Sequence, residues 1–110
     1  MFYFKANNTE YPASIAGKVL DREWDNRESK AVTLEMTYAE ASQLFVDGLS
    51  WSIVQRDTAD GETAEQEWDN SDYCVAGSIT DNRDGTVTAK MGKKTASDVL
   101  AELEEVYDGN

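Results

Sequence analysis

Apolar and polar residues alternate in short segments along most of the chain, as they do in half-buried strands. These segments are rich in aromatic and β-branched residues, which also favour strands. Six of them predict strands: residues 2–4, 14–20, 31–36, 51–54, 74–80 and 86–91. The sequence Asn82-Arg83-Asp84-Gly85 predicts a tight hairpin turn before the last strand. The equivalent connection in the first half, Asp21 to Lys30, is longer and is expected to project from the sheet.

Two further segments have apolar residues at spacings of three and four, which is typical of one face of a helix. Each follows a threonine with an acid three residues later, Thr37 with Glu40 and Thr95 with Asp98, which favours an N-terminal cap. Gly48 is placed to end the first helix. The apolar positions are Tyr38, Ala41, Leu44 and Phe45 in the first helix, and Val99, Leu100, Leu103, Val106 and Tyr107 in the second.

The two halves of the chain match each other. IAGKVLD (15–21) aligns with VAGSITD (75–81), and DNRESKAVTLEM (25–36) aligns with DNRDGTVTAKM (81–91). Strands and helices follow in the same order, so we expect a single α+β domain over residues 1–110. It would consist of two β-β-β-α pseudo-repeats, residues 1–48 and 49–110. We expect a mostly antiparallel sheet with both helices packed on one face.

Net charge is the property of the composition that most limits the possible functions of this chain. The chain has 22 acidic and 10 basic residues, a net charge of −12, and 40% hydrophobic residues. This balance fits a folded, soluble chain and disfavours direct binding to nucleic acid or to an anionic membrane. There is no apolar run of the roughly 20 residues that a membrane span needs, and no signal-peptide pattern. The single cysteine suits a reducing compartment, so the expected location is the cytoplasm.

The acids gather in two segments that contain no base. Seven lie between residues 57 and 72, which we interpret as a solvated loop, and five lie between residues 98 and 108. Such segments suit a basic protein partner, which long-range charge attracts most strongly at low salt. The acids expected to contact this partner are Asp57, Asp60, Glu62, Glu65, Glu67, Asp69, Asp72, Glu102 and Glu105.

No catalytic motif is present in the sequence. Histidine is absent, which removes the commonest general base and metal ligand. Cys74 lies in a predicted strand and is expected to be a buried structural thiol. The acidic segment departs from the calcium-loop pattern, because Ala59 stands at its third position and Glu62 at its sixth. We therefore expect a protein that is not an enzyme and that needs no metal or other cofactor.

The three tryptophans fall into two groups. Trp51 lies in an apolar strand and is expected in the core, whereas Trp24 and Trp68 both lie in the tetrapeptide EWDN, among charged residues. Exposed aromatic residues among charges are typical interface hot spots. We include Trp24 and Trp68 among the partner-binding residues. The alternative is that each ring folds back over the edge of the sheet.

Residues 11–54, YPASIAGKVLDREWDNRESKAVTLEMTYAEASQLFVDGLSWSIV, resemble small acidic proteins encoded in bacteriophages and prophages. The resemblance covers less than half of the chain. It implies a setting rather than an activity: phage-encoded proteins of this size are often counter-defence inhibitors or small parts of the virion.

Two main hypotheses follow. The charge favours an inhibitor that binds a basic host protein, a nucleic-acid-binding or defence protein, by imitating a polyanion such as DNA. The alternative is a small structural component of a phage virion, from the tail or the head–tail region, that contacts other phage structural proteins through its edge strands. The virion is then its location, and the charge only maintains solubility. Self-association into a homo-oligomer is open in both. A small-molecule pocket between the halves is a third alternative, which no polar constellation supports.

Overall fold

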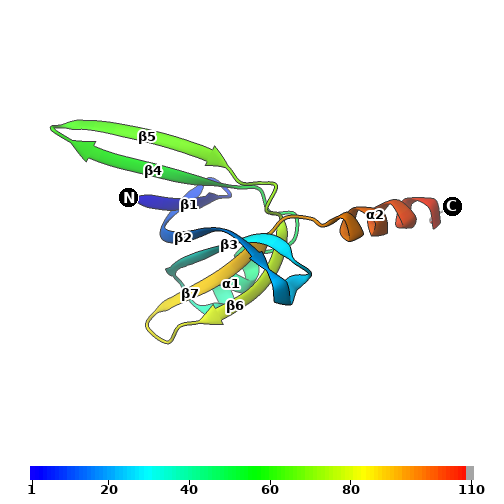
Figure 1. Cartoon of the computed structure of the whole chain (residues 1–110). Helices are drawn as coiled ribbons and strands as arrows, with labels where there is room; N and C mark the ends of the chain where they lie inside the picture. The colour runs from blue at the N-terminus through cyan, green and yellow to red at the C-terminus, as the bar shows by residue number, and fades with distance from the viewer. Residues whose placement is uncertain (109–110) are drawn as a thin grey trace.

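The computed structural model describes residues 1–108, with only the backbone described for Lys18, Val19 and residues 104–108. The described chain forms seven strands and two α-helices in an α+β arrangement, which confirms the predicted fold class (Figure 1). The elements are β1 Phe2–Ala6, β2 Thr9–Asp21, the short 3-10 helix Arg22–Trp24, β3 Arg27–Glu35, α1 Tyr38–Leu44, β4 Trp51–Ala59, β5 Glu62–Asp69, β6 Val75–Asp81, β7 Thr86–Gly92 and α2 Ala96–Asp108.

All described strands belong to one antiparallel sheet in the order β5-β4-β1-β2-β3-β7-β6. The long strand β2 joins the two parts of this sheet. Its first residues, Thr9 to Pro12, pair with β1, and residues from Ala13 to Asp21 pair with β3. The predicted antiparallel pairing is therefore confirmed.

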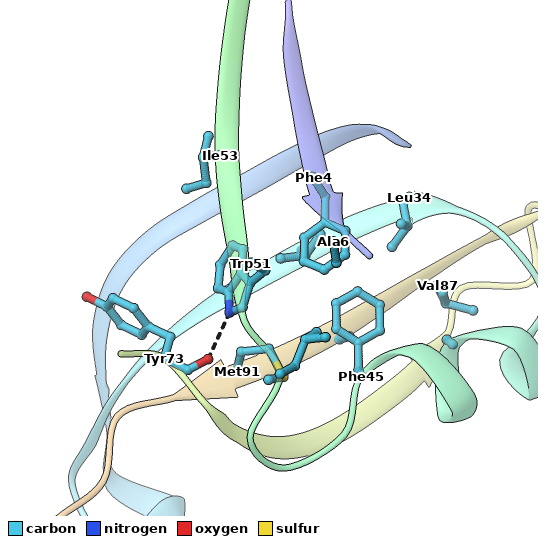
Figure 2. Close-up of a cluster of buried hydrophobic side chains, with 13 residues drawn as sticks. Phe4, Ala6, Leu34, Phe45, Trp51, Ile53, Tyr73, Val87 and Met91 are labelled. Atoms are coloured by element: carbon cyan, nitrogen blue, oxygen red, sulfur yellow. Dashed lines mark hydrogen bonds between the residues drawn. The ribbon is translucent and has the colours of Figure 1, made fainter. Parts of the chain in front are cut away.

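The core lies on the side of the sheet that α1 covers. Trp51, Phe4 and Met91 are its largest fully buried side chains. Figure 2 shows Trp51 and Phe4 beside Phe45, whose ring centroid lies 4.9 Å from that of Phe4. The indole Nε1–H of Trp51 donates a hydrogen bond of 2.8 Å to the backbone carbonyl of Tyr73, so its one polar group is satisfied. The predicted core position of Trp51 is confirmed.

Helix α1 begins and packs largely as predicted. Thr37 and Glu40 form a complete capping box, with each side chain bonded to the backbone of the other residue. Ala41 and Phe45 are buried, whereas Tyr38, which the periodicity placed on the same face, is exposed. The helix contacts β6 and β7, so a helix of the first half covers strands of the second half.

The duplicated β-β-β-α unit is not confirmed. The β2–β3 and β6–β7 hairpins do share one detail: each has a bulge at its Ala-Gly pair, after Ala16 and after Ala76. Beyond these hairpins the halves differ. β1 pairs with β2, but β4 pairs with β5 and β1 rather than with β6.

Strand β5, which the sequence did not predict, accounts for this difference. It also corrects the prediction that residues 57–72 form an acidic loop. Asp60 and Gly61 have φ values of 52° and 78°. Positive φ at both central residues is the requirement of a type I′ turn, whose twist matches that of paired strands. The segment therefore folds into the β4–β5 hairpin instead of a loop.

The prediction that both helices pack on the sheet is wrong for α2. This helix extends away from the sheet (Figure 1). The face over β6 and β7 is already occupied by α1. The cap of α2 is as predicted: Asp98 N donates to Thr95 Oγ1 and Thr95 N donates to Asp98 Oδ2. Within residues 1–108, neither helix has the length and apolar character that crossing a membrane requires.

Candidate protein-binding surfaces

The β4–β5 hairpin is an exposed arm. Each residue from position 57 to position 69 is exposed, and the hairpin extends beyond the core in Figure 1. Cross-strand pairs stabilise it, including the hydroxyls of Thr58 and Thr63 at 3.2 Å. The arm thus has regular structure without burying its own side chains.

The acids of this arm are less isolated than the sequence indicated, because bases on β4, on β1 and at Met1 lie beside them. The amino group of Met1 lies 2.8 Å from Asp57, and its hydrogen bond lowers the pKa of that carboxyl. Arg56 lies 2.5 Å from Glu65, and Lys5 lies 3.3 Å from Glu67. Arg56 also binds Glu10 in a bidentate pair, which lowers the pKa of that glutamate. The middle of the arm is therefore close to charge balance.

The remaining predicted acids lie in separate places. Asp60 and Glu62, at the tip, make no ion pair with any described residue. Near the root of the hairpin, Asp69 accepts hydrogen bonds from the hydroxyl and backbone N–H of Ser71, which lower its pKa, and Asp72 lies 3.3 Å from Lys93.

The predicted acids of α2 are far from this arm. Glu102 pairs with Lys94, whereas the Glu105 side chain lies outside the described residues. Because the arm and α2 extend in opposite directions, the predicted acids do not form one continuous surface (Figure 1).

The ring of Trp24 folds back over the sheet. This is the alternative to the partner-binding role predicted for Trp24. Only residues 22–26 connect β2 to β3, which is shorter than predicted. The half-buried Trp24 ring lies against Gly77, where a β-carbon would come within 2.6 Å of ring atom Cη2. The Arg27 guanidinium lies 4.8 Å from the ring centroid. Trp24 thus has a packing role that does not require a partner.

Trp68 remains exposed beside a second exposed aromatic ring, Phe2. Each is 44% exposed, and both border a hollow of about 400 Å³ at the root of the hairpin. Trp68 is the cross-strand partner of Ile53, a core residue, so the hollow continues the core to the surface. Phe2 was not among the predicted partner-binding residues, because an aromatic strand at residues 2–4 suggests burial in the core. The lining residues are Phe2, Lys30, Ile53, Trp68, Asp69, Asn70, Asp72, Tyr73 and Lys93.

A network of polar contacts fixes the floor of this hollow. The ammonium groups of Lys30 and Lys93 lie 4.6 and 5.1 Å from the centroid of the Tyr73 ring. Asn70, which is buried, accepts from Lys30 at 2.5 Å and donates to the backbone carbonyl of Trp68 at 3.1 Å. Burial, together with a hydrogen bond to Glu28, raises the pKa of Tyr73 above its ordinary value. The tyrosine is therefore a neutral, fixed part of the lining of this hollow.

Two observations concern metal ions and the single thiol. No group of three or more His, Cys, Asp or Glu side chains in residues 1–108 has the geometry to hold a metal ion. Cys74 lies one residue before β6 and is half-buried, not fully buried as predicted. A scan against protein-family models and searches of curated proteins and of solved structures found no match to this chain.

Proposed function

We propose that this chain is a non-enzymatic protein-binding subunit of a larger assembly, and that Trp68 and Phe2 form the centre of one contact surface. The observation that carries this proposal is the exposure of two large aromatic side chains on one hollow. Covering one such side chain contributes roughly 1.5–3 kcal/mol of transfer free energy. Aromatic residues next to rigid pockets are the usual anchors of protein interfaces.

The shape of the protein supports the same function. The structure measures 60 × 31 × 25 Å, because the hairpin and α2 extend from a small central core. β5 and β6 are the edges of the described sheet, and the acids on β5 oppose pairing with a second copy through that edge. Arms of this kind contact neighbouring subunits without enlarging the core. The resemblance to phage-encoded proteins makes a small structural component of a virion the corresponding setting.

Inhibition of a basic host protein by polyanion mimicry is the second candidate. Asp60 and Glu62 favour it, because they lie at the tip of an arm without an ion pair to any described residue, on a chain of net charge −12. The bases beside Asp57, Glu65 and Glu67 reduce the density of negative charge along the rest of the arm. A mimic would act in the cytoplasm of the host.

Affinity capture from a nuclease-treated lysate of producing cells, followed by elution with a salt gradient, tests the proposal. For an assembly subunit, bound proteins resist elution by salt, and Trp68→Ala removes them. Tyr38→Ala, at an exposed aromatic residue of α1, is the matched control and retains them.

Polyanion mimicry gives the opposite pattern. Partners then elute at moderate salt, and reversal of Glu62, Glu65 and Glu67 to lysine removes them. Salt-sensitive partners that Trp68→Ala leaves bound would overturn the assembly proposal.

A further inference from the structure

Helix α2 presents an apolar stripe to water. Val99 is 46% exposed, Leu100 is 59% exposed and Leu103 is 50% exposed. They lie at positions i, i+1 and i+4, so they share one face of the helix. Elsewhere the protein buries its leucines and valines mostly in the core, for example Val32, Leu34 and Leu49. Three exposed apolar residues on one helix face therefore form a patch that needs an explanation.

The base of this helix is fixed to the sheet. The buried guanidinium of Arg27 donates through Nη1 to Asp98 Oδ2 at 2.5 Å and to the backbone carbonyl of Lys93 at 2.7 Å. Thr95 and Asp98 cap the first turn. Beyond that turn the described residues of α2 make no extensive contact with another element, although Ala101 and Glu102 border a hollow beside Cys74 and Val75. An isolated helix of 13 residues is only marginally stable in water, so contact with a partner would stabilise it.

The charge of α2 indicates the charge of the partner that it would bind. Five acids and no base lie between residues 98 and 108, and two of these acids, Asp98 and Glu102, pair with Arg27 and Lys94. Two copies of such a helix repel each other. One face of a helix about 20 Å long also offers less than the roughly 800 Å² per partner of a stable interface. The charge disfavours a second copy of this chain and favours a partner of opposite charge, whose groove can contact more of the helix than a single face.

We infer that α2 is a docking helix, whose Val99, Leu100 and Leu103 side chains insert into an apolar groove rimmed by Lys and Arg side chains on a partner protein. This is the helix-in-groove form of recognition, in which residues spaced by three and four anchor the helix. Glu102 lies next to the stripe, and a basic rim would compete with Lys94 for its carboxylate. The inference stands on α2 alone and does not depend on the Trp68 hollow.

A synthetic amphipathic peptide made only of leucine and lysine serves as the probe. It offers an apolar face bordered by positive charge, as the proposed groove does. Its binding to the full chain is measured by fluorescence anisotropy. Amide hydrogen exchange of residues 97–103 is measured in parallel. We expect binding to slow exchange across α2, and Leu100→Gln with Leu103→Gln to weaken binding at least tenfold. Glutamine retains helix propensity, so the helix itself is preserved.

Two control variants separate the sites. Leu20→Gln, at an exposed leucine of β2, leaves the affinity unchanged, and so does Trp68→Ala. If Trp68→Ala weakens binding and the α2 variant does not, the inference fails while the proposed function stands. Equal binding by all variants also overturns it. A dimer in sedimentation that the α2 variant dissociates would overturn it too, because the occupant would then be a second copy.

Discussion

The buried Arg27 holds Asp98 at 2.5 Å, across 71 positions of sequence. Arg27 begins β3 and is only 5% exposed, and Asp98 lies in the first turn of α2. Asp98 also accepts from the backbone N–H of Thr95. One charge-assisted network therefore sets where α2 leaves the sheet.

This network gives the attachment of α2 a dependence on pH. The hydrogen bond from Arg27, with that from Thr95, lowers the pKa of Asp98 from 3.8 to about 2. The pair stabilises the folded protein above pH 3.8, and this contribution is lost as the pH falls through about 2. We expect Asp98→Asn to be less stable than the parent at pH 7, and the difference to shrink between pH 4 and pH 2. Urea denaturation across this range measures it.

Asp60→Asn is the control for that experiment, because Asp60 makes no ion pair with a described residue. It should differ little from the parent at any pH. A constant difference between Asp98→Asn and the parent from pH 7 to pH 2 would show that the carboxylate charge of Asp98 does not hold α2.

Gly77 and Gly17 occupy matching positions in the two bulged hairpins, but only Gly77 lies under a ring. A methyl group at Gly77 would come within 2.6 Å of Trp24 and 3.1 Å of the Lys90 β-carbon, whereas Gly17 has nothing within 4 Å. We expect Gly77→Ala to lower the free energy of unfolding by about 1–3 kcal/mol. Gly17→Ala should change it by less than about 0.5 kcal/mol. Chemical denaturation of both variants provides the comparison.

Removing the ring should relieve the clash at Gly77. In a Trp24→Ala background, the additional cost of Gly77→Ala should largely disappear, which a double-mutant cycle detects as coupling. Independent, additive effects would mean that Trp24 does not rest on Gly77.

Trp51 combines packing with one buried hydrogen bond. Trp51→Phe removes the donor to the Tyr73 carbonyl and leaves that oxygen unpaired, which costs about 1–3 kcal/mol. Trp51→Ala adds a cavity and should cost about 3–5 kcal/mol. Urea denaturation should show this order, while Trp68→Phe, at an exposed ring, stays within about 0.5 kcal/mol of the parent. A similar loss for Trp68→Phe would place that ring in the core.

The outer part of the hairpin should be dispensable for folding. Asp57 and Ala64 are cross-strand partners, so residues 58–63 can be replaced by Asn-Gly with the pairing below retained. Because every removed side chain is exposed, the free energy of unfolding should change by less than about 1 kcal/mol.

Ile53→Ala, at a buried residue of the same hairpin, is the contrasting variant and should cost about 2–5 kcal/mol. Unfolding of the shortened chain would mean that the tip stabilises the core. Loss of captured partners without loss of stability would identify the tip as a contact site.

Much of the local structure could be predicted because it depends on neighbouring residues. The alternation of Val32 and Leu34 with polar residues identified β3, and the threonines at positions 37 and 95 identified both helix starts. The acidic hairpin was missed even though Asp60-Gly61 is a strong turn signal, because the flanking strands are polar on both faces and lack the usual alternation.

The internal match also had a structural counterpart that the sequence did not reveal. Thr33 and Thr88, aligned in the two halves, lie opposite each other on β3 and β7, with their hydroxyl oxygens 2.8 Å apart. The matching segments are thus neighbours in one sheet.

The sequence by itself determined every strand segment except β5, both helix starts with their caps, and the burial of Trp51, since periodicity and capping act over a few residues. Only the tertiary structure decided which bases lie beside Asp57, Glu65 and Glu67, that Trp24 is packed while Trp68 is exposed, and that α2 leaves the sheet. The physical reason is that ion pairing and exposure depend on strands brought together from distant positions, which no local pattern specifies.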